Sequence, residues 1–90
     1  MKYVLAYDSA GASLEDLQRH FPAHRARLAG FAERGELLMI GPYSDRSGAL
    51  AVFRSREAAE EFARSDPFVT EGLVGGWTIR EWLEALVPEE

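Results

Sequence analysis

The chain has 90 residues, 47% of them hydrophobic, and its ten lysines and arginines against fifteen aspartates and glutamates give a net charge of −5. This length suits one domain over residues 1–90, and the acidic balance argues against nucleic acid as a partner. The lack of cysteine excludes disulfides and thiolate chemistry, and no apolar run is long enough for a membrane span or follows the pattern of a signal peptide, so we expect a cytoplasmic protein.

The first part of the chain predicts a strand and then one long helix. Residues 2–8 are rich in β-branched and aromatic side chains and are followed by a short loop. Ser13 is placed to cap a helix, because acidic residues follow it and apolar residues then recur at helical spacing as far as Gly35. Pro22 lies inside this helix and predicts either a kink or a second helix start.

The middle of the chain predicts a hairpin and a second helix. Residues 36–41 and 48–54 are apolar runs separated by a loop of turn-forming residues. Ser55 is placed to cap a helix with an apolar stripe. This helix should stop or bend at Asp66-Pro67, because the residue before a proline disfavours helical geometry.

The last part predicts a short extra turn and a final strand. The turn lies within residues 68–73, and the strand occupies residues 77–82, which follow two glycines and are rich in strand formers. The acidic end, with Glu84, Glu89 and Glu90, is expected to fray.

Together these elements predict an α+β fold of the ferredoxin-like βαββαβ type, with a four-stranded antiparallel sheet and both helices on one face. Alternation in the first strand sets Tyr3, Leu5 and Tyr7 against Val4 and Ala6, so both faces of the sheet are apolar. An open apolar face needs a second covering layer. The sequence therefore predicts a face-to-face homodimer.

His24 is the first candidate for chemistry, because it interrupts the apolar row of the first helix. A core histidine held by one polar partner is the simpler interpretation. Asp66 is a candidate partner, although aspartate before proline is also a natural helix N-cap. Counted from the same end of the sheet at ~1.5 Å per residue, both lie about 15–16 Å along neighbouring helices, so an imidazole–carboxylate hydrogen bond is geometrically allowed.

No metal or cofactor is expected. His20 precedes His24 by one helical turn, a spacing that two metal ligands can use, but no convincing third ligand follows, and solvent exposure of His20 is the favoured interpretation. The serines lack the surroundings of a nucleophile elbow, and the glycines do not form a phosphate-binding loop before a helix.

The chain resembles the YciI-like (YCII-related) family over nearly its whole length. The features that carry the resemblance are the first strand, Pro22-Ala23-His24 with Leu28, the segment from Gly35 to Pro42, the second helix, Asp66-Pro67-Phe68, Gly72-Leu73 and Ile79-Arg80-Glu81-Trp82. The resemblance implies a dimeric ferredoxin-like α+β barrel, and the histidine–aspartate pair of the family maps onto His24 and Asp66. Two positions depart from it: Phe21 stands where many relatives carry arginine, and Arg25 where leucine is usual.

Our leading hypothesis is a small cofactor-free enzyme that acts on a small organic molecule. His24 would move a proton, Asp66 would orient it, and the reaction would be isomerase-like or, as the resemblance implies, lyase- or dehydrochlorinase-like. One alternative is a dimeric domain that binds a small molecule or a partner protein without converting it. Another is a purely structural pair of His24 and Asp66 that specifies packing.

Overall fold

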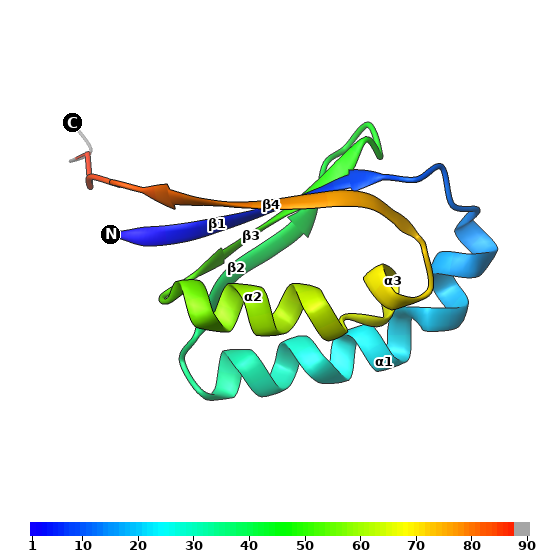
Figure 1. The fold of residues 1–90 in the computed structure, drawn as a ribbon, viewed down its shortest axis with the longest axis horizontal. Coiled ribbons are helices and arrows are strands. Elements are labelled where there is room, and N and C mark those ends of the chain that lie inside the picture. The colour runs from blue at the N-terminus through cyan, green and yellow to red at the C-terminus, as the bar shows by residue number, and fades with distance from the viewer. Residues whose placement is uncertain (88–90) are drawn as a thin grey trace.

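The computed structural model describes residues 1–87, so the predictions for Glu89 and Glu90 lie outside the described part of the chain. Its elements follow the predicted order, and the predicted short extra turn is a helix that begins one residue earlier, at Pro67 (Figure 1). They are β1 (Lys2–Ser9), α1 (Leu14–Glu33), β2 (Leu37–Pro42), β3 (Gly48–Phe53), α2 (Arg56–Ser65), α3 (Pro67–Thr70) and β4 (Val74–Trp82).

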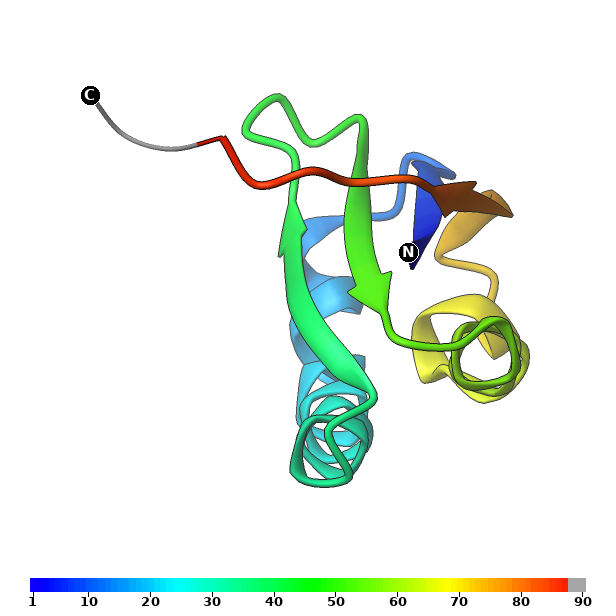
Figure 2. The same cartoon turned by 90° about the vertical axis from the view of Figure 1, so that its left-hand side faces the viewer.

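The sheet has four strands in the order β2-β3-β1-β4, and each neighbouring pair is antiparallel. Both long helices cover the same face of the sheet (Figures 1 and 2). This is the predicted ferredoxin-like α+β fold. In this fold α1 and the end of α2 lie next to each other on the face of the sheet that β1 and β3 help to form.

Helix α1 begins after the predicted cap Ser13, ends at Glu33, two residues before Gly35, and runs through Pro22 without a second start. Ser13 caps it, since its hydroxyl oxygen accepts a hydrogen bond from the amide of Asp16 at 3.1 Å. Gly35 follows the helix with a φ of +74°, a conformation that glycine adopts without strain. Figure 1 shows the axis changing direction between the first turns, in blue, and the cyan remainder, so the kink and not the second start is correct.

Strand β4 begins three residues earlier than predicted. Gly75 and Gly76 are poor strand formers, yet this stretch pairs with the end of β1, where Asp8 lies opposite Gly76 and the register shifts by a bulge after Asp8. A Cβ atom on Gly75 would come within 3.2 Å of the Ser9 carbonyl oxygen. The close approach of two backbones therefore explains a glycine inside this strand.

The core lies between the sheet and the helices. Phe31, Phe53 and Phe62 form an aromatic cluster, with ring centroids 5.3 Å apart for Phe31–Phe62 and 5.4 Å for Phe53–Phe62. The buried residues of α2 are otherwise alanines, whose small side chains let this helix approach the sheet closely. This tight packing fixes how far the end of α2, next to Asp66, lies from the sheet.

The opposite face of the sheet keeps apolar side chains at the surface. Met39 is 61% exposed, Trp82 46% and Leu50 37%, whereas Val52 on the same face is buried. The register places these residues opposite the inward-facing Leu5 row. The prediction that both faces are apolar is therefore correct.

One residue of the segment after β4, Glu84, is held against the start of the chain. Glu84 forms ion pairs with the Lys2 ammonium at 2.7 Å and with the amino group of Met1 at 2.9 Å. The hydrogen bond from Lys2, followed by that from the terminal amino group, lowers the pKa of Glu84 to about 2. The prediction of fraying is wrong at this residue. Within residues 1–87, no helix combines the length and apolar character needed to cross a membrane.

Candidate active site

His24 and Asp66 are in direct contact. The His24 Nδ1 atom lies 2.8 Å from the Asp66 Oδ1 atom, although the two residues are 42 positions apart in the chain. His24 projects from the middle of α1, and Asp66 lies at the junction of α2 and α3. The structure thus brings together the two candidates that the sequence placed at the same distance along neighbouring helices.

Asp66 both caps a helix and binds His24. Its side chain is the N-cap of α3, where its Oδ1 atom accepts a hydrogen bond from the Phe68 amide at 3.2 Å, and Pro67 is the first residue of that helix. The residue is fully buried. The capping interpretation and the pairing interpretation therefore describe the same carboxylate, and capping holds it in the position where it meets the imidazole.

Tyr7 is a third member of this group. Its hydroxyl donates a hydrogen bond to the Asp66 Oδ2 atom at 2.8 Å. Burial first, and then the negative charge of Asp66, raise the pKa of Tyr7 well above its ordinary value, so the phenol keeps its proton. Strand alternation placed Tyr7 on the same face as Leu5, but nothing in the sequence indicated which group its hydroxyl meets.

The His24 ring is held by aromatic side chains as well as by Asp66. It stacks on Phe68, with centroids 4.1 Å apart and planes 9° apart, and the edge of Phe62 approaches it at 5.9 Å. These contacts fix the ring plane, and the Asp66 carboxylate fixes which nitrogen faces it. The neutral imidazole therefore carries its proton on Nδ1 and leaves Nε2 with a free lone pair.

The Nε2 atom of His24 remains accessible. It makes no hydrogen bond within residues 1–87, and it is not among the buried polar atoms of that region that lack a partner. The side chain as a whole is 9% exposed. The exposed part of the ring is thus small and includes Nε2.

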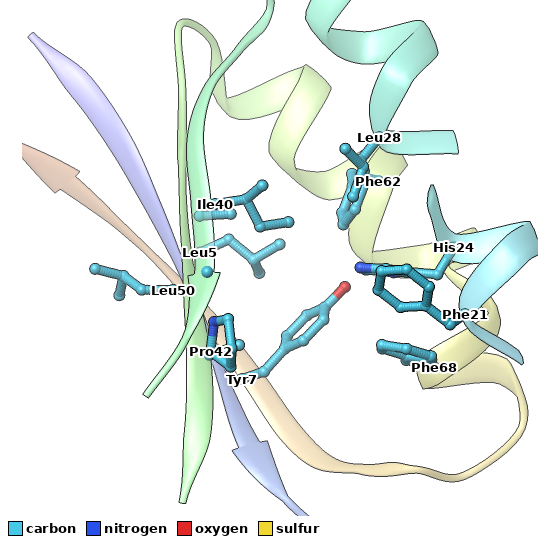
Figure 3. A pocket seen from close by; sticks show the side chains of 13 residues that line it. Leu5, Tyr7, Phe21, His24, Leu28, Ile40, Pro42, Leu50, Phe62 and Phe68 are labelled. Carbon is cyan, nitrogen blue, oxygen red and sulfur yellow. The ribbon is translucent and has the colours of Figure 1, made fainter. Parts of the chain in front are cut away.

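An apolar cavity of about 310 Å³, here called the inner cavity, opens beside this group (Figure 3). Figure 3 shows the Tyr7 hydroxyl and a ring nitrogen of His24 pointing toward one another at one end of it. The other labelled side chains around them are apolar. They are Leu5, Phe21, Leu28, Ile40, Pro42, Phe62 and Phe68, whereas the Leu50 side chain points to the other side of the sheet.

A larger outer cavity of about 660 Å³ adjoins the inner one. Because several residues line both, the two cavities are parts of one cleft. The shared residues are Tyr7, Phe21, Pro42, Ala49 and Phe68. Tyr7 and His24 are the polar side chains of the inner part, whereas Asp8, Gln18 and Arg46 contribute to the wall of the outer part.

Arg27 braces the two helices that carry the pair. Its guanidinium donates to the carbonyl oxygens of Glu61 and Phe62, each at 3.3 Å, and lies 5.7 Å from the centroid of the Phe62 ring. This contact links α1 to the last turn of α2, close to Asp66. The sequence offered no signal for it, because one arginine among several on a helix has no special pattern.

His20 does not join the group, and it is partly exposed. Within the described residues, no three His, Asp or Glu side chains gather closely enough to hold a metal ion. The position before Pro22 is occupied by Phe21, which is 48% exposed and whose ring centroid lies 6.2 Å from that of His24. Phe21 therefore gives the cleft wall near His24 an apolar surface.

Comparison with known proteins agrees with this architecture. A model of the YCII-related domain matches residues 1–83. The protein YciI of Escherichia coli O6:H1 and that of Shigella flexneri are each 36% identical over 85 residues, covering 81% of this chain and 87% of theirs. A solved structure of 5-chloro-2-hydroxyhydroquinone dehydrochlorinase from Burkholderia phenoliruptrix AC1100, in complex with 2,5-dihydroxybenzoquinone, superposes with a TM-score of 0.75 at 20% identity, covering 94% of this chain and 96% of that one. The likeness in structure establishes a shared fold.

Proposed function

This chain belongs to the YCII-related family, and from that premise we propose that it is a small enzyme, working without a cofactor, in which His24 transfers a proton and Asp66 orients the imidazole. The observation that carries this proposal is the 2.8 Å contact between the two side chains at the wall of an apolar cleft. A buried pair without access to a cleft would support a structural role instead.

The roles follow from the geometry of the pair. The Nε2 atom of His24 accepts a proton from the substrate, and the resulting imidazolium is stabilised by the Asp66 carboxylate next to Nδ1. Returning the proton to a different atom of the substrate completes an isomerisation. Giving it to a departing group, while a carbon–carbon double bond forms, completes an elimination.

The cleft favours a small and largely apolar substrate. A cavity of about 310 Å³ is at the small end of the range for ligand sites, and its wall is aromatic and aliphatic apart from Tyr7 and His24. An apolar wall excludes water and strengthens the interaction between His24 and Asp66. The dehydrochlorinase with the same fold acts, by its name, on a small chlorinated ring compound, which supports elimination as the reaction type.

The functional unit proposed here is a homodimer. Met39, Leu50 and Trp82 leave an apolar surface on the sheet face away from the helices. A second copy placed against this face would bury the same residues of both chains, as a twofold interface requires.

Catalysis and simple binding can be separated by following the fate of the ligand. We expect that a metabolite library screened for thermal stabilisation contains a compound that raises the melting temperature, because binding at 100 times the dissociation constant adds about 2.7 kcal/mol to the free energy of unfolding. Mass spectrometry of the same mixture should then show that the compound is converted. Hits that bind and are recovered unchanged would contradict the enzyme and support a binding domain.

A further inference from the structure

The cleft contains one cationic side chain, which belongs to the loop between β2 and β3. Among residues 1–87, Arg46 is the only lysine or arginine that lines either cavity, and it lines the outer one. Arg19, Arg34 and Arg64 form ion pairs with carboxylates, whereas the Arg46 guanidinium forms no ion pair or hydrogen bond within the same residues. Arg46 therefore keeps its side-chain donors for a ligand.

The backbone of Arg46 has a conformation that arginine rarely adopts. Its φ is +62°, and within the described part of the chain every other positive φ belongs to a glycine. Glycine adopts this conformation without strain, and turns that need it favour glycine or asparagine. Strain of this kind persists only where the surrounding structure enforces it, and it is concentrated at ligand-binding positions.

Hydrogen bonds hold the strained turn in place beside the cleft. The Arg46 amide donates to the Tyr43 carbonyl oxygen at 3.0 Å, and the Ser47 amide donates to the Asp45 carboxylate at 2.9 Å. The Ser9 amide donates to the Ser47 carbonyl oxygen at 3.0 Å, which ties the loop to the end of β1. The backbone that carries the guanidinium is therefore fixed before a ligand binds.

The two neighbouring carboxylates do not neutralise Arg46. Asp45 accepts the hydrogen bond from the Ser47 amide and lines neither cavity. Asp8 contributes to the outer cavity, but strand alternation directs its side chain to the sheet face opposite that of Tyr7. The outer cavity thus presents an unpaired positive charge.

The inner end of the cleft determines which way a charged ligand lies. Its wall is apolar apart from Tyr7 and His24, and the buried carboxylate of Asp66 lies 2.8 Å from the polar atom of each. A negative charge at that end would be repelled by Asp66 and would lose its hydration. An anionic group of a ligand is consequently favoured only at the outer end, where Arg46 lies.

We propose that Arg46 is a specificity-determining residue that binds the carboxylate of a small organic acid, whose apolar part extends inward toward His24. Phe21 and Phe68 line both cavities and form an apolar passage between the two ends. The inference rests on the proposed function in taking this acid to be the substrate. A guanidinium suits the role because it binds a carboxylate through two parallel hydrogen bonds.

Binding of phenyl-substituted carboxylic acids to the intact chain tests the proposal. The tightest-binding acid in the series from phenylacetate to 6-phenylhexanoate is compared, by calorimetry at pH 7 and low salt, with its primary amide and with the amine of the same length. We expect the acid to bind at least ~10-fold more tightly than the amide, because a charge-assisted pair replaces a neutral hydrogen bond. We expect the amine to bind more weakly than both. The amide is easier to desolvate than the carboxylate, so burial alone predicts the opposite order of acid and amide.

Three arginine variants separate the specific contact from general charge effects. Arg46→Gln should abolish the preference for the acid and leave the affinity for the amide unchanged. Arg25→Gln is the matched control, because Arg25 is exposed and lines neither cavity, and it should keep the preference. Arg46→Gly should abolish the preference without lowering the melting temperature, because glycine adopts the φ of +62° without strain.

Several results would overturn the inference. They are equal or tighter binding of the amide or the amine, a preference that survives Arg46→Gln or Arg46→Gly, an equal loss in Arg25→Gln, and the lack of saturable binding by every acid of the series. Because none of these measurements involves turnover, their failure would leave the proposed proton transfer standing. Conversely, a folded His24→Ala variant that converts the substrate normally would refute the proposed function without altering the preference of the native protein for the acid.

Discussion

Turnover of the substrate is expected to fall by ~10²–10⁴-fold when His24 is replaced by alanine, because positioned general acid–base catalysis typically contributes that factor. The variant loses the only side chain at the cleft wall of the inner cavity that can both take up and release a proton near neutral pH, since the phenol of Tyr7 retains its proton. The rate is measured with the compound identified by the thermal screen and product analysis.

His20→Ala is the matched control for this experiment. His20 lies one turn earlier on α1, is partly exposed and lines neither cavity. Its replacement should leave turnover within about twofold of the native rate, because surface substitutions typically change free energies by no more than about ±0.5 kcal/mol. Normal turnover by a folded His24→Ala variant would remove His24 from the mechanism.

The largest loss of stability is expected for Asp66→Ala, about 2–4 kcal/mol in the free energy of unfolding, because buried hydrogen-bonding groups lose their partner. The carboxylate accepts hydrogen bonds from Tyr7 and from the Phe68 amide and pairs with His24, and it is fully buried. Alanine would leave all three groups without their partner and would also remove the N-cap of α3. Urea unfolding monitored by circular dichroism measures the loss.

Two further variants make this prediction specific. Asp66→Asn has nearly the same shape and keeps a carbonyl oxygen for His24 and Phe68, so it should cost less than alanine while still lowering turnover by removing the charge. Asp16→Ala removes a surface aspartate whose ion pair with Arg19 spans 3.3 Å, and it should cost less than about 1 kcal/mol. A loss for Asp66→Ala as small as that for Asp16→Ala would show that the buried group does not stabilise the fold.

The sequence predicted the fold and allowed a contact between His24 and Asp66, which the family resemblance also implied. Both predictions depend on periodicity, because alternation and helical spacing fix which face is buried and a constant rise per residue fixes how far along a helix a side chain lies. The kink at Pro22 did not affect the predicted position of His24 along α1. That position was counted from the end of the helix back to His24, and the kink lies before His24.

What the sequence did not indicate are contacts between side chains far apart in the chain. The Tyr7 hydroxyl reaches Asp66 across 59 positions, and Arg27 reaches two carbonyl groups of α2. Periodicity assigns such residues to a face but does not specify a partner. The early start of β4 and the ion pairs of Glu84 were missed for the same reason, since each depends on pairing with the first strand.

The central claim, that His24 presents an accessible proton-accepting nitrogen to the cleft while Asp66 holds the other, is tested most directly by NMR of the ¹⁵N-labelled imidazole. Our account predicts that the neutral ring carries its proton on Nδ1 and that Nε2 is unprotonated. A neutral ring protonated on Nε2 would contradict it.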